Sequence, residues 1–129
     1  MDTGPLYGLM IPRDQHNEAA RAAFRSFNSA SEVLLPFATL LELHRLIVHR
    51  KPADPAFALG VIHKVRQAYP VVVPTAGDLD SGLELLHRYS DQAITLADAV
   101  LASMAKNAGA QVLTFDHRHF GLMGAEVYG

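Results

Sequence analysis

Signals that start helices alternate with short apolar runs along this chain, and this alternation limits the possible folds more than any other feature. Asp54 followed by Pro55 is a helix cap with a proline at the first helical position. The segments Thr75-Ala-Gly-Asp78 and Thr95-Leu-Ala-Asp98 both have the capping-box pattern of a hydroxyl and a carboxylate three residues apart. Similar signals occur at two further places, and the predicted helices cover residues 15–27, 39–50, 54–69, 75–89 and 95–109.

Short apolar stretches fall between these helices, at residues 32–35, 71–73, 111–115 and 126–128. Strands that are apolar on both faces are typical of parallel sheets covered by helices. A chain of 129 residues has the length of one domain, so we expect a single α/β domain over residues 1–129. Such a sheet needs a strand before the first helix, but only Met1 to Thr3 precede Gly4 and Pro5, so this strand is expected to be a stub unless the chain continues upstream.

The composition excludes several classes of site. The absence of cysteine excludes a disulfide framework, a thiol nucleophile and cysteine-bound metal, and it suits a reducing cytoplasm. The longest apolar stretch, residues 33–41, is interrupted by Pro36 and Thr39, so we expect no membrane span, and the first residues do not resemble a signal peptide. A net charge of −2 gives no overall basic field, so any phosphate binding must depend on a local patch or a bound cation.

Four carboxylates stand where an open α/β sheet would place a ligand site, beyond the carboxyl ends of its strands. Asp116 follows the run 111–115, and Asp2 stands where a first strand would end. Glu42 and Asp98 are lone acids in apolar helical segments, where carboxylates are seldom buried without a partner. If the four converge, their mutual repulsion is relieved by a hard divalent cation such as Mg²⁺ or Mn²⁺. Such a site suits hydrolysis of a phosphodiester bond.

Each acid also has a local structural explanation. Asp98 is the last residue of its capping box, and Asp116 could cap the backbone that follows it. Glu42 could form a surface ion pair with Arg45, three residues further along the helix. Asp2, at the beginning of the chain, need have no role. The residues alone leave these alternatives open.

Five short motifs occur in a fixed order along the chain. They are Asp2-Thr-Gly-Pro-Leu6, Asp14-Gln-His16 with Glu18-Ala-Ala20, Pro36 through Thr39-Leu-Leu-Glu42-Leu43, Ile94-Thr-Leu-Ala-Asp98-Ala99, and Leu113-Thr-Phe-Asp116-His-Arg-His119-Phe120. The ordered set resembles the PIN-domain ribonucleases, and most closely the VapC-type toxins of bacterial toxin–antitoxin pairs. Each motif alone is weak, but the acids are separated by 40, 56 and 18 residues, which suits that family.

This resemblance implies a three-layer PIN-like α/β fold with a central, mostly parallel sheet of four to five short strands flanked by helices. It implies that Asp2, Glu42, Asp98 and Asp116 are the catalytic residues and hold Mg²⁺ or Mn²⁺, with Thr114 as an auxiliary hydroxyl. The implied activity is divalent-metal-dependent endoribonuclease cleavage of RNA in the cytoplasm, with a second copy of the chain and a small VapB-like antitoxin as partners. The alternatives are a PIN-fold RNA-processing nuclease that is not a toxin, and a non-catalytic PIN-like binding module.

The chain departs from the family pattern at its beginning. Family members usually have several apolar residues before the first acid, whereas only Met1 precedes Asp2 here. We therefore expect Asp2 to be held loosely, which would weaken a metal site.

Cationic side chains beside the last acid are interpreted as a local RNA-binding patch. His117, Arg118 and His119 follow Asp116 directly, and Arg45 would extend the patch. The alternative is that they are exposed residues of a loop with no ligand, and a zinc site built on the histidines is the weaker interpretation.

Overall fold

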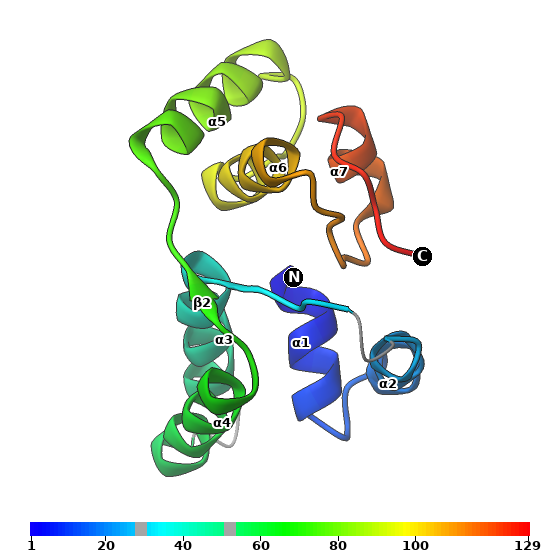
Figure 1. The fold of residues 1–129 in the computed structure, drawn as a ribbon. Helices are drawn as coiled ribbons and strands as arrows, with labels where there is room; N and C mark the ends of the chain where they lie inside the picture. Colours follow the sequence, from blue (N-terminus) through cyan, green and yellow to red (C-terminus); the bar gives the residue numbers. More distant parts are fainter. Residues whose placement is uncertain (28–30, 51–53) are drawn as a thin grey trace. The chain divides into compact units, whose positions relative to one another are not determined.

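A computed structural model of the protein describes residues 1–27, 31–50 and 54–129 (Figure 1). These residues form two compact units, which are described separately: the first comprises Met1 and Thr3–Val72, and the second comprises Asp2 and Val73–Gly129. In chain order the elements are α1 (Thr3–Met10), α2 (Asn17–Arg25), β1 (Leu35–Pro36), α3 (Phe37–His49), α4 (Pro55–Ala68), β2 (Val71–Val72), α5 (Ala76–Arg88), α6 (Leu96–Ala108) and α7 (His117–Leu122).

The first unit consists of four helices and one pair of short strands. Helix α1 packs against α2 and α3, and α3 packs against α4. Gly8 allows α1 and α2 to approach closely, because a Cβ at this position would lie 3.3 Å from the Cβ of Ala20. Strands β1 and β2 pair in parallel, with Leu35 beside Val71. The buried apolar residues of this unit include Leu6, Tyr7, Ala20, Leu35, Leu40, Leu43, Ile47, Ala58, Val61 and Val65.

The second unit packs α5 against α6 and adds the short helix α7. The contact between α5 and α6 is tight at Gly82, where a Cβ would lie 2.9 Å from Cγ2 of Val100 and 3.1 Å from its backbone nitrogen. A parallel bridge joins Val112 to Val127. The core of this unit contains Leu85, Ala99, Leu101, Ala102, Ala105, Val112, Phe120, Met123 and Ala125.

Three of the predicted helices are confirmed together with their caps. The side chain of Asp54 accepts a hydrogen bond from the Phe57 backbone at 2.9 Å and starts α4. Thr75 starts α5 with both arms of a capping box, and Thr95 starts α6. Helix α6 ends at Gly109, whose φ of 63° lies in the left-handed region that favours glycine. In the described part of the chain, no helix combines the length and the apolar character needed to cross a bilayer.

The predicted start of α3 is wrong, and α2 is shorter than predicted. Helix α3 begins at Phe37, two residues before the expected cap at Thr39. The hydroxyl of Thr39 is buried and donates to the carbonyl of Met1 at 2.8 Å, so a contact distant in sequence takes the place of the cap. Helix α2 covers Asn17–Arg25 rather than residues 15–27.

Two helices were not expected from the sequence. Helix α1 includes Gly4 and Pro5, which suggest a turn, but Pro5 lies in the first turn, where its missing N–H needs no partner within the helix. Helix α7 occupies the segment that was interpreted as a loop, and Asp116 is its N-cap. Among the described residues no strand precedes the first helix, because α1 begins at Thr3.

The sheet of four to five strands is not confirmed. In the described ranges, strands are limited to the two-residue pair β1 and β2 and to the bridge between Val112 and Val127. Two backbone hydrogen bonds join the expected strands 111–115 and 126–128, from Val112 to Glu126 and from Tyr128 to Val112. Because strands this short form few ladder bonds, packed helices must supply most of the stability.

Candidate active site

Asp2 belongs to the second unit and is held there by two hydrogen bonds. Its backbone N–H donates to the carbonyl of Leu113 at 2.9 Å, and its Oδ2 accepts from the hydroxyl of Thr114 at 2.8 Å. The expectation of a loosely held Asp2 is therefore wrong. A pair of bonds to one extended segment fixes the residue without a complete strand.

Thr114 links two of the predicted acids. Its hydroxyl donates to Asp2 and accepts from the backbone N–H of Asp116 at 3.0 Å. The residue is only 1% exposed, so both bonds are shielded from water. A hydroxyl has a single proton, and here that proton is committed to the carboxylate of Asp2. Thr114 thus ties the position of Asp2 to the beginning of α7.

Asp116 caps α7 and is bonded twice by the same residue. Its Oδ1 accepts from the backbone N–H of His119 at 3.1 Å, and its Oδ2 lies 2.8 Å from Nδ1 of the His119 ring. Burial raises the pKa of Asp116, but the hydrogen bonds from His119 and the positive charges of His119 and Arg118 outweigh it, so the pKa is lowered from its ordinary value. The side chain is 40% exposed, and each carboxylate oxygen keeps a further lone pair for another ligand.

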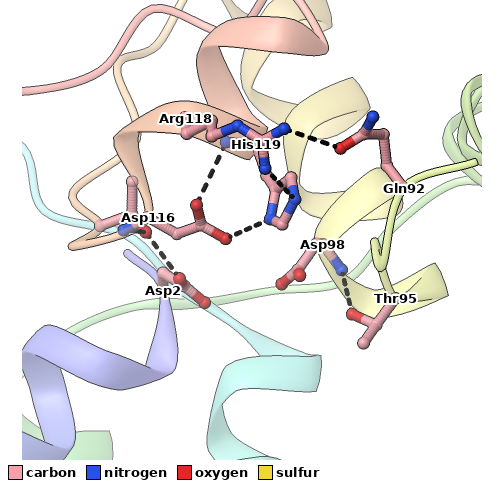
Figure 2. Close-up of polar contacts among 8 residues, drawn as sticks. Asp2, Gln92, Thr95, Asp98, Asp116, Arg118 and His119 are labelled. Atoms are coloured by element: carbon pink, nitrogen blue, oxygen red, sulfur yellow. Dashed lines mark hydrogen bonds and ion pairs between the residues drawn. The ribbon is translucent and has the colours of Figure 1, made fainter. Parts of the chain in front are cut away.

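Asp98 lies in the first turn of α6. Its backbone N–H donates to the hydroxyl of Thr95 at 3.1 Å, which is the capping bond expected from the sequence. Figure 2 shows the carboxylate of Asp98 pointing away from Thr95, toward the side on which Asp2 and Asp116 lie. The carboxylate is half-buried on a helix whose next residues are buried. The cap and an outward-directed carboxylate therefore occur together in the same residue.

Glu42 belongs to the first unit, on the exposed side of α3. Its Oε2 accepts a hydrogen bond from the hydroxyl of Thr3 at 3.2 Å. Ion pairing between Glu42 and Arg45 is not found in the residues that the structure describes. The four predicted acids are thus divided, with Glu42 in the first unit and the other three in the second.

The cationic residues after Asp116 lie on the first turn of α7 and not in a loop. His117 is exposed, while the ring of His119 faces Asp116. Arg118 donates from Nη2 to Oε1 of Gln92 at 3.2 Å (Figure 2). Gln92 was not identified from the sequence, because a lone polar residue in a connecting segment carries no pattern that would single it out.

Comparison with protein families places the site in a known context. A match to the PIN domain covers residues 1–124, which is nearly the whole chain. The chain belongs to the PIN-domain family. This confirms the family predicted from the ordered motifs. A search of curated protein sequences found no match.

The PIN assignment agrees with a comparison to solved structures. The chain is similar to the Mycobacterium tuberculosis toxin VapC20, described as cleaving the sarcin–ricin loop. The TM-score is 0.81 at 20% sequence identity, over 96% of this chain and 93% of the other. At that identity the likeness establishes a shared PIN-like α/β fold.

The donor set of this PIN domain suits a hard divalent cation. All four predicted ligands are carboxylates, and oxygen ligands are those that Mg²⁺ and Mn²⁺ prefer. Among residues 1–27, 31–50 and 54–129, no group of three or more histidine, aspartate or glutamate side chains is already close enough to hold an ion. The chemistry of the donors therefore fits a cation.

Charge is distributed very unevenly between the two units. The second unit has eight acidic residues against three Lys and Arg, for a net charge of −5. The first unit has eight Lys and Arg against five acids, for a net charge of +3. A small overall charge thus conceals a strongly acidic part that contains three of the candidate ligands.

Proposed function

We propose that the protein is a divalent-metal-dependent endoribonuclease in which Asp2, Glu42, Asp98 and Asp116 hold Mg²⁺ or Mn²⁺. The observation that carries the proposal is the link from Asp2 through Thr114 to Asp116, in a chain that matches the PIN domain over residues 1–124. This link joins residues 112 positions apart in sequence. A purely structural role for Asp2 would not need a buried hydroxyl directed at its carboxylate.

The cation and the side chains of the protein would have different tasks in the reaction. When bound, the cation would lower the pKa of a water molecule and neutralise charge on the phosphate. Thr114 keeps Asp2 oriented through its only proton, and His119 keeps Asp116 oriented. Glu42 is oriented by Thr3, the residue that follows Asp2 in the sequence. The carboxylates are thus directed before substrate arrives, which reduces the reorganisation needed for catalysis.

RNA is the proposed substrate, and cationic side chains supply its phosphate contacts. We assign contacts to His117, Arg118 and His119 on α7 and to Arg45 on α3. Arg45 is exposed, and no ion pair neutralises it within the described part of the chain. The net charge of +3 on the first unit favours a polyanion there.

The biological setting that we propose is that of a toxin. The chain shares its fold with VapC20, which is described as a toxin that cleaves the sarcin–ricin loop. We therefore propose that the chain forms a single functional PIN domain, acts in the cytoplasm, pairs with a second copy and is inhibited by a small VapB-like antitoxin. An RNA-processing PIN nuclease with the same chemistry and no antitoxin is the alternative.

The decisive experiment is a titration of the purified protein with Mg²⁺ and Mn²⁺, followed by thermal unfolding and RNA cleavage. Wild type is compared with Asp98→Asn and with Asp80→Asn, an exposed acid on α5 that serves as the matched control. A cation at a hundred times its Kd should stabilise wild type and the control by about 2.7 kcal/mol. Asp98→Asn should lose both this stabilisation and cleavage. Absence of both effects in wild type would contradict the proposal and favour a non-catalytic binding module.

A further inference from the structure

His119 contacts both oxygens of the Asp116 carboxylate. Its backbone N–H donates to Oδ1, and the Nδ1 atom of its ring lies 2.8 Å from Oδ2 (Figure 2). The backbone contact alone would leave the carboxylate free to rotate about its Cβ–Cγ bond. The second contact fixes that rotation, and the His119 side chain is only 19% exposed, so water competes weakly for the bond. One residue therefore sets both the position and the plane of this carboxylate.

The carboxylate of Asp116 determines which ring nitrogen of His119 carries the proton, because its Oδ2 can only accept and lies 2.8 Å from Nδ1. Arg118 lies on the other side of the ring. Its Nη1 lies 3.5 Å from Nε2 of His119, a long contact made by a group that has only donors. This contact suits an Nε2 atom that presents its lone pair, which agrees with a proton on Nδ1. There it can be donated to Oδ2 of Asp116. Free neutral imidazole in water favours the opposite tautomer, so the acceptor Oδ2 of Asp116 holds this one.

Gln92 holds the guanidinium of Arg118 beside this ring. Its Oε1 accepts from Nη2 of Arg118 at 3.2 Å, and its own backbone N–H donates to the carbonyl of Tyr89 at 2.9 Å. Gln92 therefore sits in an ordered turn between α5 and α6. The sequence of contacts from Gln92 through Arg118 and His119 to Asp116 lies entirely within the second unit.

We propose that His119 is a positioning residue for Asp116, whose carboxylate it holds through its backbone N–H and its ring Nδ1. The clamp orients Asp116 as an oxygen ligand for the divalent cation, and only this last step rests on the proposed function. The tautomer and the clamp are properties of the protein by itself. Outer partners that orient metal ligands in this way typically change metal affinity about 10–100-fold when they are removed.

The tautomer is measured directly by ¹⁵N–¹H correlation spectra of the histidine rings, at a pH of about 8 where ordinary histidines are neutral. The signals of His119 are identified by their loss in His119→Asn. Wild type should show His119 protonated on Nδ1. Arg118→Ala and Gln92→Ala should leave the proton on Nδ1, because the acceptor on Asp116 remains in both. His87→Asn, on the exposed face of α5, is the control and should leave the His119 signals unchanged.

The clamp is tested by the affinity for Mn²⁺, measured without RNA. His119→Phe keeps a ring but removes the donor, and should weaken Mn²⁺ binding about tenfold or more. His119→Asn places an amide donor near the position of Nδ1 and should restore affinity to within about threefold of wild type.

The outcomes separate this proposal from the proposed function. A His119 ring protonated on Nε2 in wild type would overturn the proposal, and so would equal Mn²⁺ affinity in wild type and His119→Phe. Loss of RNA affinity in His119→Phe with unchanged Mn²⁺ affinity would overturn the clamp and leave His119 with the RNA contact alone. If wild type binds no Mn²⁺, the proposed function fails, while the spectra of wild type still decide whether the clamp exists.

Discussion

Two helices of the second unit begin with the same four-residue pattern, and their carboxylates are used in opposite ways. At the start of α5 and of α6, a threonine hydroxyl accepts the backbone N–H of the aspartate three residues later, at 3.1 Å in both cases. The carboxylate of Asp78 turns back to the N–H of Thr75 at 2.8 Å and also accepts from Asn107 at 2.7 Å. The carboxylate of Asp98 points away from its cap, toward Asp2 and Asp116 (Figure 2).

The difference shows which part of a capping box is local and which part is not. The bond from the aspartate N–H to the threonine depends only on the helix start and forms at both sites. The direction of the carboxylate depends on surrounding groups. Asn107 of α6 engages Asp78, which is 7% exposed, whereas Asp98 is only half-buried. A sequence motif can thus fix a helix while leaving its acid available for another purpose.

The largest difference between Asp98 and Asp78 is expected in the rate of RNA cleavage, when each is changed to asparagine. Asp98→Asn removes a proposed metal ligand but keeps the capping bond, which uses the backbone N–H. RNA cleavage should fall about a thousandfold, because several kcal/mol of transition-state stabilisation are lost. Asp78→Asn should leave the cleavage rate of the folded protein unchanged. Both rates are measured on a labelled RNA under single-turnover conditions, and unfolding of Asp98→Asn would show that its carboxylate serves the helix after all.

The free energy of unfolding should depend more on Asp78 than on Asp98. Asp78→Ala removes one arm of the capping box and leaves Nδ2 of Asn107 without its acceptor, so it should destabilise the protein by about 1–2 kcal/mol. Asp98→Ala should cost much less. Chemical denaturation of the two variants beside wild type measures the difference. Equal losses would mean that the carboxylate of Asp98 is as structural as that of Asp78.

Low pH should weaken the contribution of the Asp78 carboxylate to the stability of the folded protein. The backbone hydrogen bond from Thr75 lowers the pKa of Asp78, burial opposes it, and the bonds from Asn107 and the Thr75 side chain add to the lowering. A lowered folded-state pKa contributes stability above the unfolded value of about 3.9, and that stability is lost as the pH falls through the folded value. Wild type should have the higher Tm at pH 5, and the difference in Tm between wild type and Asp78→Asn should therefore become smaller from pH 5 toward pH 3. A difference in Tm that does not change with pH would show that the pKa of Asp78 is not lowered in the folded protein.

The smallest expected effects come from the two cap threonines. Thr75→Ala and Thr95→Ala each remove one acceptor for a helix N–H, and each should cost about 1 kcal/mol. The two losses should be similar, since the carboxylate of Asp78 keeps its bond from the backbone N–H of residue 75. Thermal unfolding of the two variants in parallel tests this expectation. A larger loss for Thr95→Ala would indicate that α6 depends on its cap more than on packing.

The sequence predicted those parts of the molecule that local bonds determine. Helices α4, α5 and α6 follow from their caps, and the end of α6 follows from Gly109. The order of the four acids indicated the PIN family, and the match over residues 1–124 confirms it.

What the sequence could not predict depends on contacts between distant segments. Thr39 was expected to cap α3, but its hydroxyl donates to the carbonyl of Met1 instead. Asp2 was expected to be loose, but Leu113 and Thr114 hold it. The ring of His119 and its support from Arg118 and Gln92 have no signature in sequence, because each contact needs a particular geometry rather than a particular spacing.

The close approach of Gly82 to Val100 suggests a way to make a temperature-sensitive variant of the protein. Gly82→Ala would push a methyl group against the side chain and the backbone nitrogen of Val100, and overpacking of this kind costs about 1–3 kcal/mol. A loss of that size should give a conditional allele, functional in cool cultures and inactive in warm ones. The gene of the proposed ribonuclease would be hard to propagate in a host. Such an allele could be cloned and grown warm, then switched on by cooling, with the growth rate at the two temperatures as the readout.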